Sequence, residues 1–139
     1  MSEYVQAGHD YFESGHNCAQ AVFLPFAKKQ MDEKLASKLS SGFGGGIGGM
    51  RMTCGALCGA IMAAGLFAGQ EGVNKEMQDR ERALVVRLND AFVAEFGTTE
   101  CKLLLQQDAD LPEPADASRP CGKYVRFCAG WIASEFTDD

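Results

Sequence analysis

Apolar side chains recur at helical spacing along most of the chain. The clearest stretch is 74–96, where one face is charged and the other repeats an apolar residue every three or four positions: Met77, Leu84, Leu88, Ala91, Phe92 and Phe96. Asn74 is a typical N-cap and Gly97 a typical helix end. A second such helix near the C-terminus, with Ser118 as its cap and Pro120 in its first turn, has the buried stripe Val125, Cys128, Ile132 and Phe136. The two patterns predict amphipathic helices at these positions.

Cap and stop residues mark five further helices. They are expected at Glu3–Glu13, Cys18 to about Lys29, Asp32 to about Ser41, Cys54–Ala68 and Cys101–Gln106. Pro25 is expected to kink or shorten the second of these. The N-caps are expected to be Asn17, Asp32, Thr53, and Thr98 or Thr99. No stretch alternates with the period of two that marks a strand. The sequence therefore predicts an all-α, compact single-domain helical bundle over residues 1–139.

A glycine-rich segment precedes the most apolar part of the chain. Six of the eight residues 42–49 are glycine, which a long regular helix would not contain. The stretch that follows, 53–69, is rich in alanine and glycine and short for a membrane span, so we interpret it as a buried central helix. The G-x-G-x-x-G pattern within the glycine segment resembles a dinucleotide site, but a helix precedes it where that site requires a strand. We expect the segment to support Cys54 rather than to bind a nucleotide.

The net charge and the N-terminal residues limit the expected binding partners and the expected cellular compartment. The chain has 13 basic and 19 acidic residues, a net charge of −6, which argues against nucleic acid and against docking on an anionic membrane. Stable membrane insertion is not expected. The first residues have neither a basic start nor an apolar core, so we expect a cytoplasmic protein. Thiols stay reduced there, which favours redox or metal chemistry over structural disulfides.

The six cysteines divide into two groups by their places on the expected helices. Four of them fall in the first turn of a helix: Cys18, Cys54, Cys101 and Cys121. Unpaired amides and the helix dipole favour a thiolate there, and a thiolate is both the nucleophile and the metal ligand. Two others, Cys58 and Cys128, fall in mid-helix, and their roles stay open. There is no C-x-x-C motif, so the four act together only if the fold gathers them, as we expect it to do.

The segment Cys54-Gly55-Ala56-Leu57-Cys58-Gly59 resembles the central signature of the C_GCAxxG_C_C family of redox-active proteins. The order here is Cys-Gly-Ala, where the family name spells Gly-Cys-Ala. The segment Phe-Gly-Thr-Thr-Glu-Cys at 96–101 and the length of the chain fit the family too. Its four signature cysteines correspond to Cys18, Cys54, Cys101 and Cys121. The resemblance implies a small cysteine protein with redox activity and no established substrate.

The first hypothesis for function is a thiol-based oxidoreductase that exchanges electrons through a disulfide or a sulfur adduct. Cys54 is expected to be the nucleophile, because it combines a helix start, the glycine segment and Arg51. Cys121, Cys101 or Cys18 would then resolve the intermediate. Arg51 has an alternative interpretation as a surface cation. The electron partner, expected to be a redox partner protein, is not specified by the sequence, and a homo-oligomer stays open.

Two other hypotheses use the same cysteines differently. Four thiolates suffice for a zinc site or an iron–sulfur cluster, so Cys18, Cys54, Cys101 and Cys121 are also the candidate metal ligands. No cofactor follows with certainty from the sequence. His16 lies two residues before Cys18 and could act as a ligand or base, or simply lie on the surface. The third hypothesis is a scaffold or interaction protein whose cysteines only pack.

Overall fold

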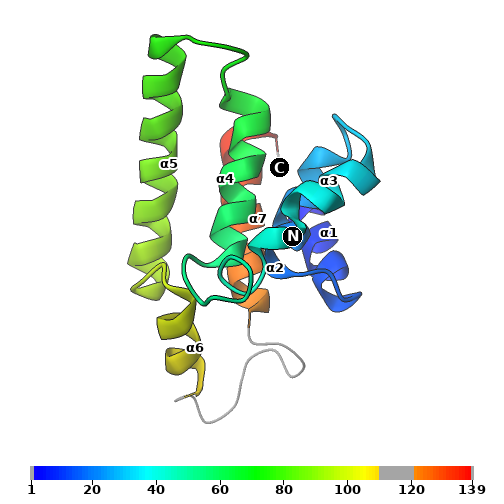
Figure 1. Ribbon diagram of the computed structural model, residues 1–139, viewed down its shortest axis with the longest axis vertical. Coiled ribbons are helices and arrows are strands. Elements are labelled where there is room, and N and C mark those ends of the chain that lie inside the picture. Colours follow the sequence, from blue (N-terminus) through cyan, green and yellow to red (C-terminus); the bar gives the residue numbers. More distant parts are fainter. Residues whose placement is uncertain (1, 110–120, 139) are drawn as a thin grey trace.

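The computed structural model describes residues 2–109 and 121–138. Within them the chain forms seven α-helices: α1 (Glu3–Glu13), α2 (Cys18–Ala27), α3 (Glu33–Ser40), α4 (Gly55–Ala68), α5 (Lys75–Phe96), α6 (Cys101–Ala109) and α7 (Gly122–Phe136). A short 3-10 turn, η1 (Ser41–Phe43), follows α3. These residues contain no strand, only one isolated antiparallel bridge between Thr53 and Glu100. The predicted all-α class is confirmed (Figure 1).

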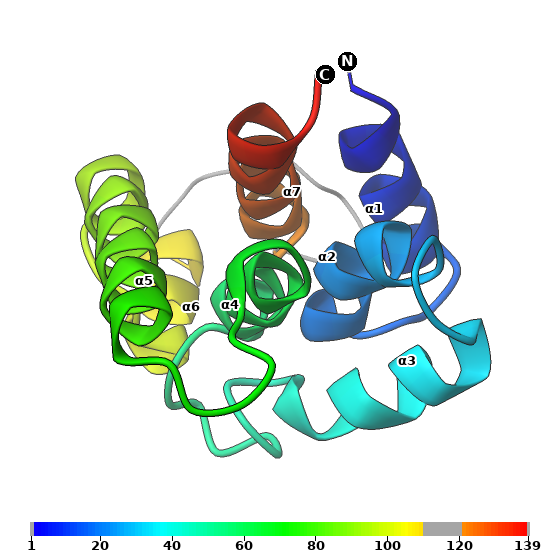
Figure 2. The same ribbon diagram turned by 90° about the horizontal axis from the view of Figure 1, so that it is seen from above.

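Helix α4 lies at the centre of the molecule, as the sequence predicted for this apolar stretch. It packs against α2, α7 and α5, and α1 covers α2 and α7 on the far side. Seen from above, α5 flanks this group on one side and α3 on another (Figure 2). Their apolar side chains form one buried cluster, which includes Phe12, Leu24, Leu57, Leu88 and Ile132. No helix in the described ranges is long and apolar enough to cross a membrane.

Two glycines let α2 lie very close to α4. A Cβ at Gly59 would collide with the backbone oxygen of Ala19 and lie 3.1 Å from its Cα. A Cβ at Gly55 would collide with the sulfur of Cys18 and lie 2.9 Å from a carbonyl oxygen. Each position therefore requires glycine for space, not for backbone conformation. Gly55 and Gly59 thus allow α2 to pack closely against α4.

Some helix ends differ from those expected. Thr53 does not cap α4; Cys54 is the N-cap residue, and it makes no side-chain capping bond. The reason is that Thr53 is engaged in the bridge to Glu100. The cap of α7 also shifts, to Cys121, while the expected cap Ser118 and the first-turn Pro120 lie outside the described residues.

The expected buried faces of the two amphipathic helices are largely confirmed. On α5, Leu84, Leu88 and Phe92 are buried. Met77 is 36% exposed, because the first turns of α5 extend past the end of α4 (Figure 1). On α7, Val125, Cys128 and Ile132 are buried and Phe136 is half-buried. The observed burial therefore differs from the expected burial only at the ends of each apolar stripe.

The glycine segment forms a run of tight turns rather than a helix. Four of its glycines have left-handed φ values between 59° and 75°: Gly45, Gly46, Gly48 and Gly49. Two residues with side chains, Ile47 and Arg51, also have positive φ. The amide of Arg51 donates to the carbonyl of Gly45 (3.0 Å), which folds the segment back on itself. The segment ends next to the start of α4, where Cys54 lies.

Candidate functional site

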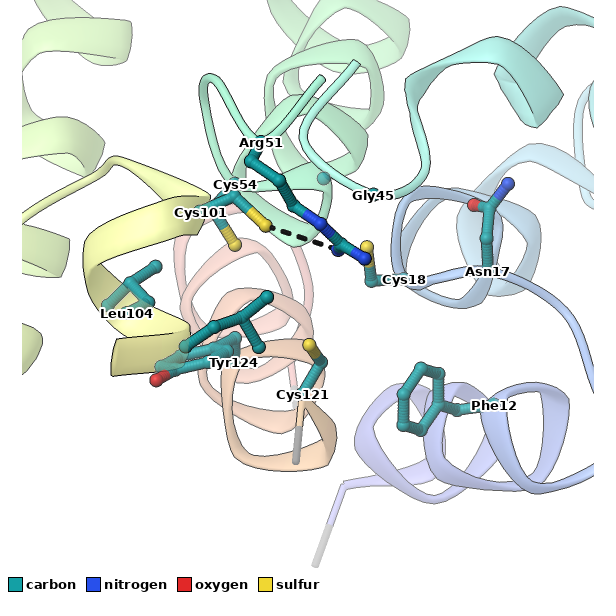
Figure 3. Close-up of a pocket in the computed structure, with 12 residues that line it drawn as sticks. Phe12, Asn17, Cys18, Gly45, Arg51, Cys54, Cys101, Leu104, Cys121 and Tyr124 are labelled. Atoms are coloured by element: carbon teal, nitrogen blue, oxygen red, sulfur yellow. Dashed lines mark hydrogen bonds between the residues drawn. The ribbon is translucent and has the colours of Figure 1, made fainter. Parts of the chain in front are cut away.

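The four cysteines at helix starts meet around one cavity of about 270 Å³. Cys18 and Cys101 are the first residues of α2 and α6, and Cys54 and Cys121 are the N-cap residues of α4 and α7. Figure 3 shows all four sulfurs directed into this space from four separate elements. The structure therefore brings together side chains that are up to 103 residues apart in the sequence.

A short antiparallel contact places Cys54 beside Cys101. Thr53 pairs with Glu100, the Cys54 amide donates to the Thr99 carbonyl (2.8 Å), and the Cys101 amide donates back across the pair (2.6 Å). Residues on either side of a paired position point to the opposite face from it. Cys54 and Cys101 therefore share one face as diagonal neighbours, whose Cα atoms lie about 7–8 Å apart in such pairs.

Cys18 is fixed by a capped helix start. Asn17 accepts a bond from the Gln20 amide (2.9 Å), and the Gln20 side chain accepts one from the Asn17 amide (3.0 Å). This reciprocal capping box confirms the cap predicted from the sequence. It directs the Cys18 sulfur onto Gly55, the residue after Cys54. The absence of a side chain at Gly55 provides the space for that sulfur.

Arg51 is an exposed cation, as the alternative interpretation expected, but its guanidinium also reaches the cavity. Its Nη1 atom donates to the Cys101 sulfur at 3.7 Å, and the residue is part of the cavity wall. In Figure 3 the side chain extends from the glycine segment past Cys101 toward Cys18. Its backbone has a φ of 61° and accepts a bond from the Lys102 amide (3.2 Å). The sequence predicted a guanidinium beside Cys54; the hydrogen bond goes to Cys101 instead.

Burial reverses the expected acidity of Cys54. This side chain is only 4% exposed, and burial raises the pKa of its thiol well above the ordinary value. The backbone amides of Leu57 and Ala56 lower the pKa, but by less, and negative charge at Cys18 and Cys121 raises it further. The expectation that a helix start lowers the pKa of Cys54 is therefore wrong. A helix start favours a thiolate only where water or a cation also reaches the sulfur.

The remaining cysteines and His16 lie outside the cavity wall. Burial raises the pKa of both the Cys58 and Cys128 thiols, and Cys128 is fully buried. Both therefore belong to the packed interior behind the site. His16 is held by its own loop instead, with Nδ1 at 3.3 Å from the Tyr11 carbonyl and 3.2 Å from the Ser14 hydroxyl. It contributes no side chain to the cavity.

Several residues that line the cavity were not identified from the sequence. They are Phe12, Asn17, Leu104, Leu105 and Tyr124. Tyr124 is buried, and its hydroxyl donates to Asp108 (2.9 Å), which ties α7 to α6. Burial first, and Asp108 second, raise the pKa of this phenol. Its position three residues after Cys121 on the same helix is the signal that could have identified it.

A metal centre is the alternative use of the same four thiols. Among residues 2–109 and 121–138, no three histidine, cysteine, aspartate or glutamate side chains are grouped so that they could hold a metal ion. The four thiols have the right chemistry for zinc or an iron–sulfur cluster.

Comparison with known proteins identifies the family. No curated protein and no solved structure matches the chain. A family model does match, over residues 16–135, and its description is "Putative redox-active protein (C_GCAxxG_C_C)". The match includes all four cavity cysteines, the glycine segment and the Cys54-Gly55-Ala56 signature. The chain therefore belongs to the C_GCAxxG_C_C family, which that description names as redox-active.

Proposed function

We propose that the protein is a thiol oxidoreductase that reduces a disulfide substrate in the four-cysteine cavity. The observation that carries this proposal is that four cysteines from four elements line one cavity large enough for a small molecule. Cys58 and Cys128, in contrast, do not line this cavity. The family description as redox-active supports the same class of chemistry.

Cys101 is the attacking thiol in this proposal. It lies at the first position of α6 and has the Arg51 guanidinium beside its sulfur. Unpaired helix amides and a nearby cation both stabilise a thiolate. The sequence had favoured Cys54 for this role, but burial raises the pKa of its thiol. Cys54 is therefore assigned the second attack, on the mixed disulfide that Cys101 forms with the substrate.

The proposed reaction has two exchange steps. The Cys101 thiolate attacks one sulfur of the substrate disulfide R–S–S–R, the S–S bond breaks, and R–S⁻ leaves and takes a proton from water. Cys54 then loses its proton to water and attacks the Cys101 sulfur of the mixed disulfide, which releases the second R–S⁻. The substrate gains two electrons and two protons, and the protein is left with a Cys54–Cys101 disulfide. Closing it requires a backbone shift of about 1–2 Å from the diagonal spacing.

The other two cavity cysteines can accept the bond afterwards. The Cys18 sulfur lies against Gly55, next to Cys54, and Cys121 is the cavity thiol with partial exposure to solvent. Exchange from Cys54 to either one would move the disulfide within the cavity without net oxidation. An unspecified redox partner protein, or a small thiol, would then reduce the protein and complete the cycle.

Single-turnover kinetics with the neutral probe 2-hydroxyethyl disulfide test these roles. We expect the Cys101→Ser variant to form its internal disulfide roughly 100-fold more slowly than the parent protein, because the attacking thiolate is lost. The Cys54→Ser variant should stop at a mixed disulfide on Cys101. Matched controls are Cys58→Ala and Cys128→Ala, which should react within about twofold of the parent if these thiols only pack.

The proposal is contradicted if Cys101→Ser reacts as fast as the parent, or if the trapped adduct lies on Cys58 or Cys128. Circular dichroism of each variant separates loss of chemistry from loss of fold. Metal analysis of the anaerobically purified protein addresses the metal alternative. About one zinc, or an iron–sulfur cluster with its visible absorption, bound stoichiometrically to the four thiols would replace the dithiol proposal.

A further inference from the structure

We infer that Arg51 makes the cavity selective for disulfides that carry a carboxylate group close to the reacting sulfur. This inference rests on the proposed function and names its substrate class. A carboxylate would lie on the guanidinium while the substrate sulfur faces Cys101.

Arg51 is the polar group of the cavity that has donors available for a ligand. The Asn17 side chain accepts from the Gln20 amide and donates to the Ser41 carbonyl (3.0 Å), so both of its ends are used within the protein. The Tyr124 hydroxyl donates to Asp108. A guanidinium has five N–H donors, and that of Arg51 makes one hydrogen bond in the part of the chain described, to the Cys101 sulfur.

Among residues 2–109 and 121–138, the positive charge of Arg51 has no carboxylate partner. The ion pairs among the described residues join other groups, and Arg51 takes part in none of them. The remaining walls near it are largely apolar, with Phe12, Leu104 and Leu105 among them. Arg51 is an exposed residue, so its charge is accessible to an anion that enters the cavity from solvent. Its planar fork matches the two oxygens of a carboxylate.

The backbone of Arg51 adopts a conformation that favours glycine, yet the residue carries a long side chain. Its φ of 61° is the left-handed region, where glycine is favoured and where Gly45, Gly46, Gly48 and Gly49 also lie. Holding a residue with a Cβ in this region is unfavourable, because the Cβ comes too close to the following carbonyl oxygen. A glycine at this position would avoid that cost. The hydrogen bonds of the Arg51 backbone keep the conformation in place and direct the guanidinium toward Cys101.

The size of the cavity limits the substrate to a small molecule. A volume of about 270 Å³ is at the lower end for ligand pockets, and it fits a short aliphatic disulfide better than a folded protein loop. Attack on such a substrate proceeds as described above: Cys101 gains the bond to one sulfur, and the carboxylate-bearing thiolate leaves and is protonated by water. Arg51 positions the sulfur and takes no part in the electron transfer.

Three probe disulfides of similar length and different charge test the inference. They are 3,3′-dithiodipropionate, its neutral diamide, and the cationic cystamine. With the parent protein we expect kcat/KM to be about tenfold higher for the carboxylate than for the diamide, the size of one charge-assisted hydrogen bond. Cystamine should react slowest. In Arg51→Met and in Arg51→Gly, which suits the left-handed backbone, the carboxylate-to-diamide ratio should fall to about one.

Lys102→Met is the matched control. Lys102 is an exposed cation next to Cys101 whose side chain does not line the cavity, so its loss should leave the ratio unchanged. If Arg51 only stabilised the Cys101 thiolate, its variants would slow all three probes by the same factor, and that result overturns the inference while the proposed function stands. Equal reactivity of the three probes with the parent protein overturns it as well. If no probe reacts at all, the proposed function fails together with it.

Discussion

The Gly59→Ala variant is expected to lower the free energy of unfolding by about 2–3 kcal/mol, the effect of forcing an extra carbon into a packed core. Gly59 lies on α4 where α2 crosses it, and the added Cβ would collide with the Ala19 carbonyl oxygen and lie 3.1 Å from its Cα. The colliding atoms belong to the backbone, so no side chain can turn aside. The two central helices would have to separate, which also moves Cys18. Urea denaturation followed by circular dichroism measures the effect.

Gly65→Ala on the same helix is the control for this prediction. A Cβ at Gly65 would meet no atom within 4 Å apart from the adjacent residues and the backbone of its own helix. Alanine in place of a helical glycine should therefore raise stability, by about 0.5–1 kcal/mol. If Gly59→Ala were as stable as Gly65→Ala, the close contact between α2 and α4 would not exist in the folded protein.

The Gly46→Ala variant is expected to change both stability and the chemistry of the site. Gly46 has a φ of 71°, and an added Cβ would lie 2.7 Å from the Cβ of Cys101 and 2.8 Å from the Cα of Arg51. The collision adds about 1–3 kcal/mol to the cost of the left-handed backbone. It also displaces the two residues that form the attacking centre. Unfolding curves and the rate of Cys101 alkylation at neutral pH measure the two effects.

Gly49→Ala separates backbone strain from crowding. Gly49 has a similar φ of 75°, but a Cβ there meets nothing within 4 Å. This variant should lose only about 1–2 kcal/mol and keep the alkylation rate of Cys101. Equal behaviour of the two variants would mean that the glycine segment does not support the cysteine site.

The helices could be predicted from the sequence because their signals are local. The cap at Asn17, the end at Gly97 and the apolar face with Leu84 and Leu88 each lie within a few residues of the element that they define. The start of α4 could not be predicted in the same way. Thr53 pairs with Glu100, 47 residues later in the chain, and no local pattern records such a contact. Long-range pairing decided which residue became the cap.

The sequence indicated which four cysteines would lie together, but it did not indicate the pKa of the Cys54 thiol. The shared position at helix starts was enough to select Cys18, Cys54, Cys101 and Cys121, which line one cavity. Acidity depends on burial as well, and burial is a property of the assembled core. For that reason the pKa of Cys54 changes in the direction opposite to the expected one. The contact of Arg51 with Cys101, 50 residues away, likewise depends on the fold.

The most direct test of the account is to map the disulfide that forms when the reduced protein reacts with one equivalent of a small disulfide. Peptide mass analysis after blocking the free thiols identifies the pair. A dithiol centre in the cavity predicts one disulfide within each chain, formed between Cys54 and Cys101 or moved by exchange to Cys18 or Cys121, while Cys58 and Cys128 remain reduced. A protein that forms no internal disulfide, or forms one that contains Cys58 or Cys128, would contradict a dithiol centre in the cavity.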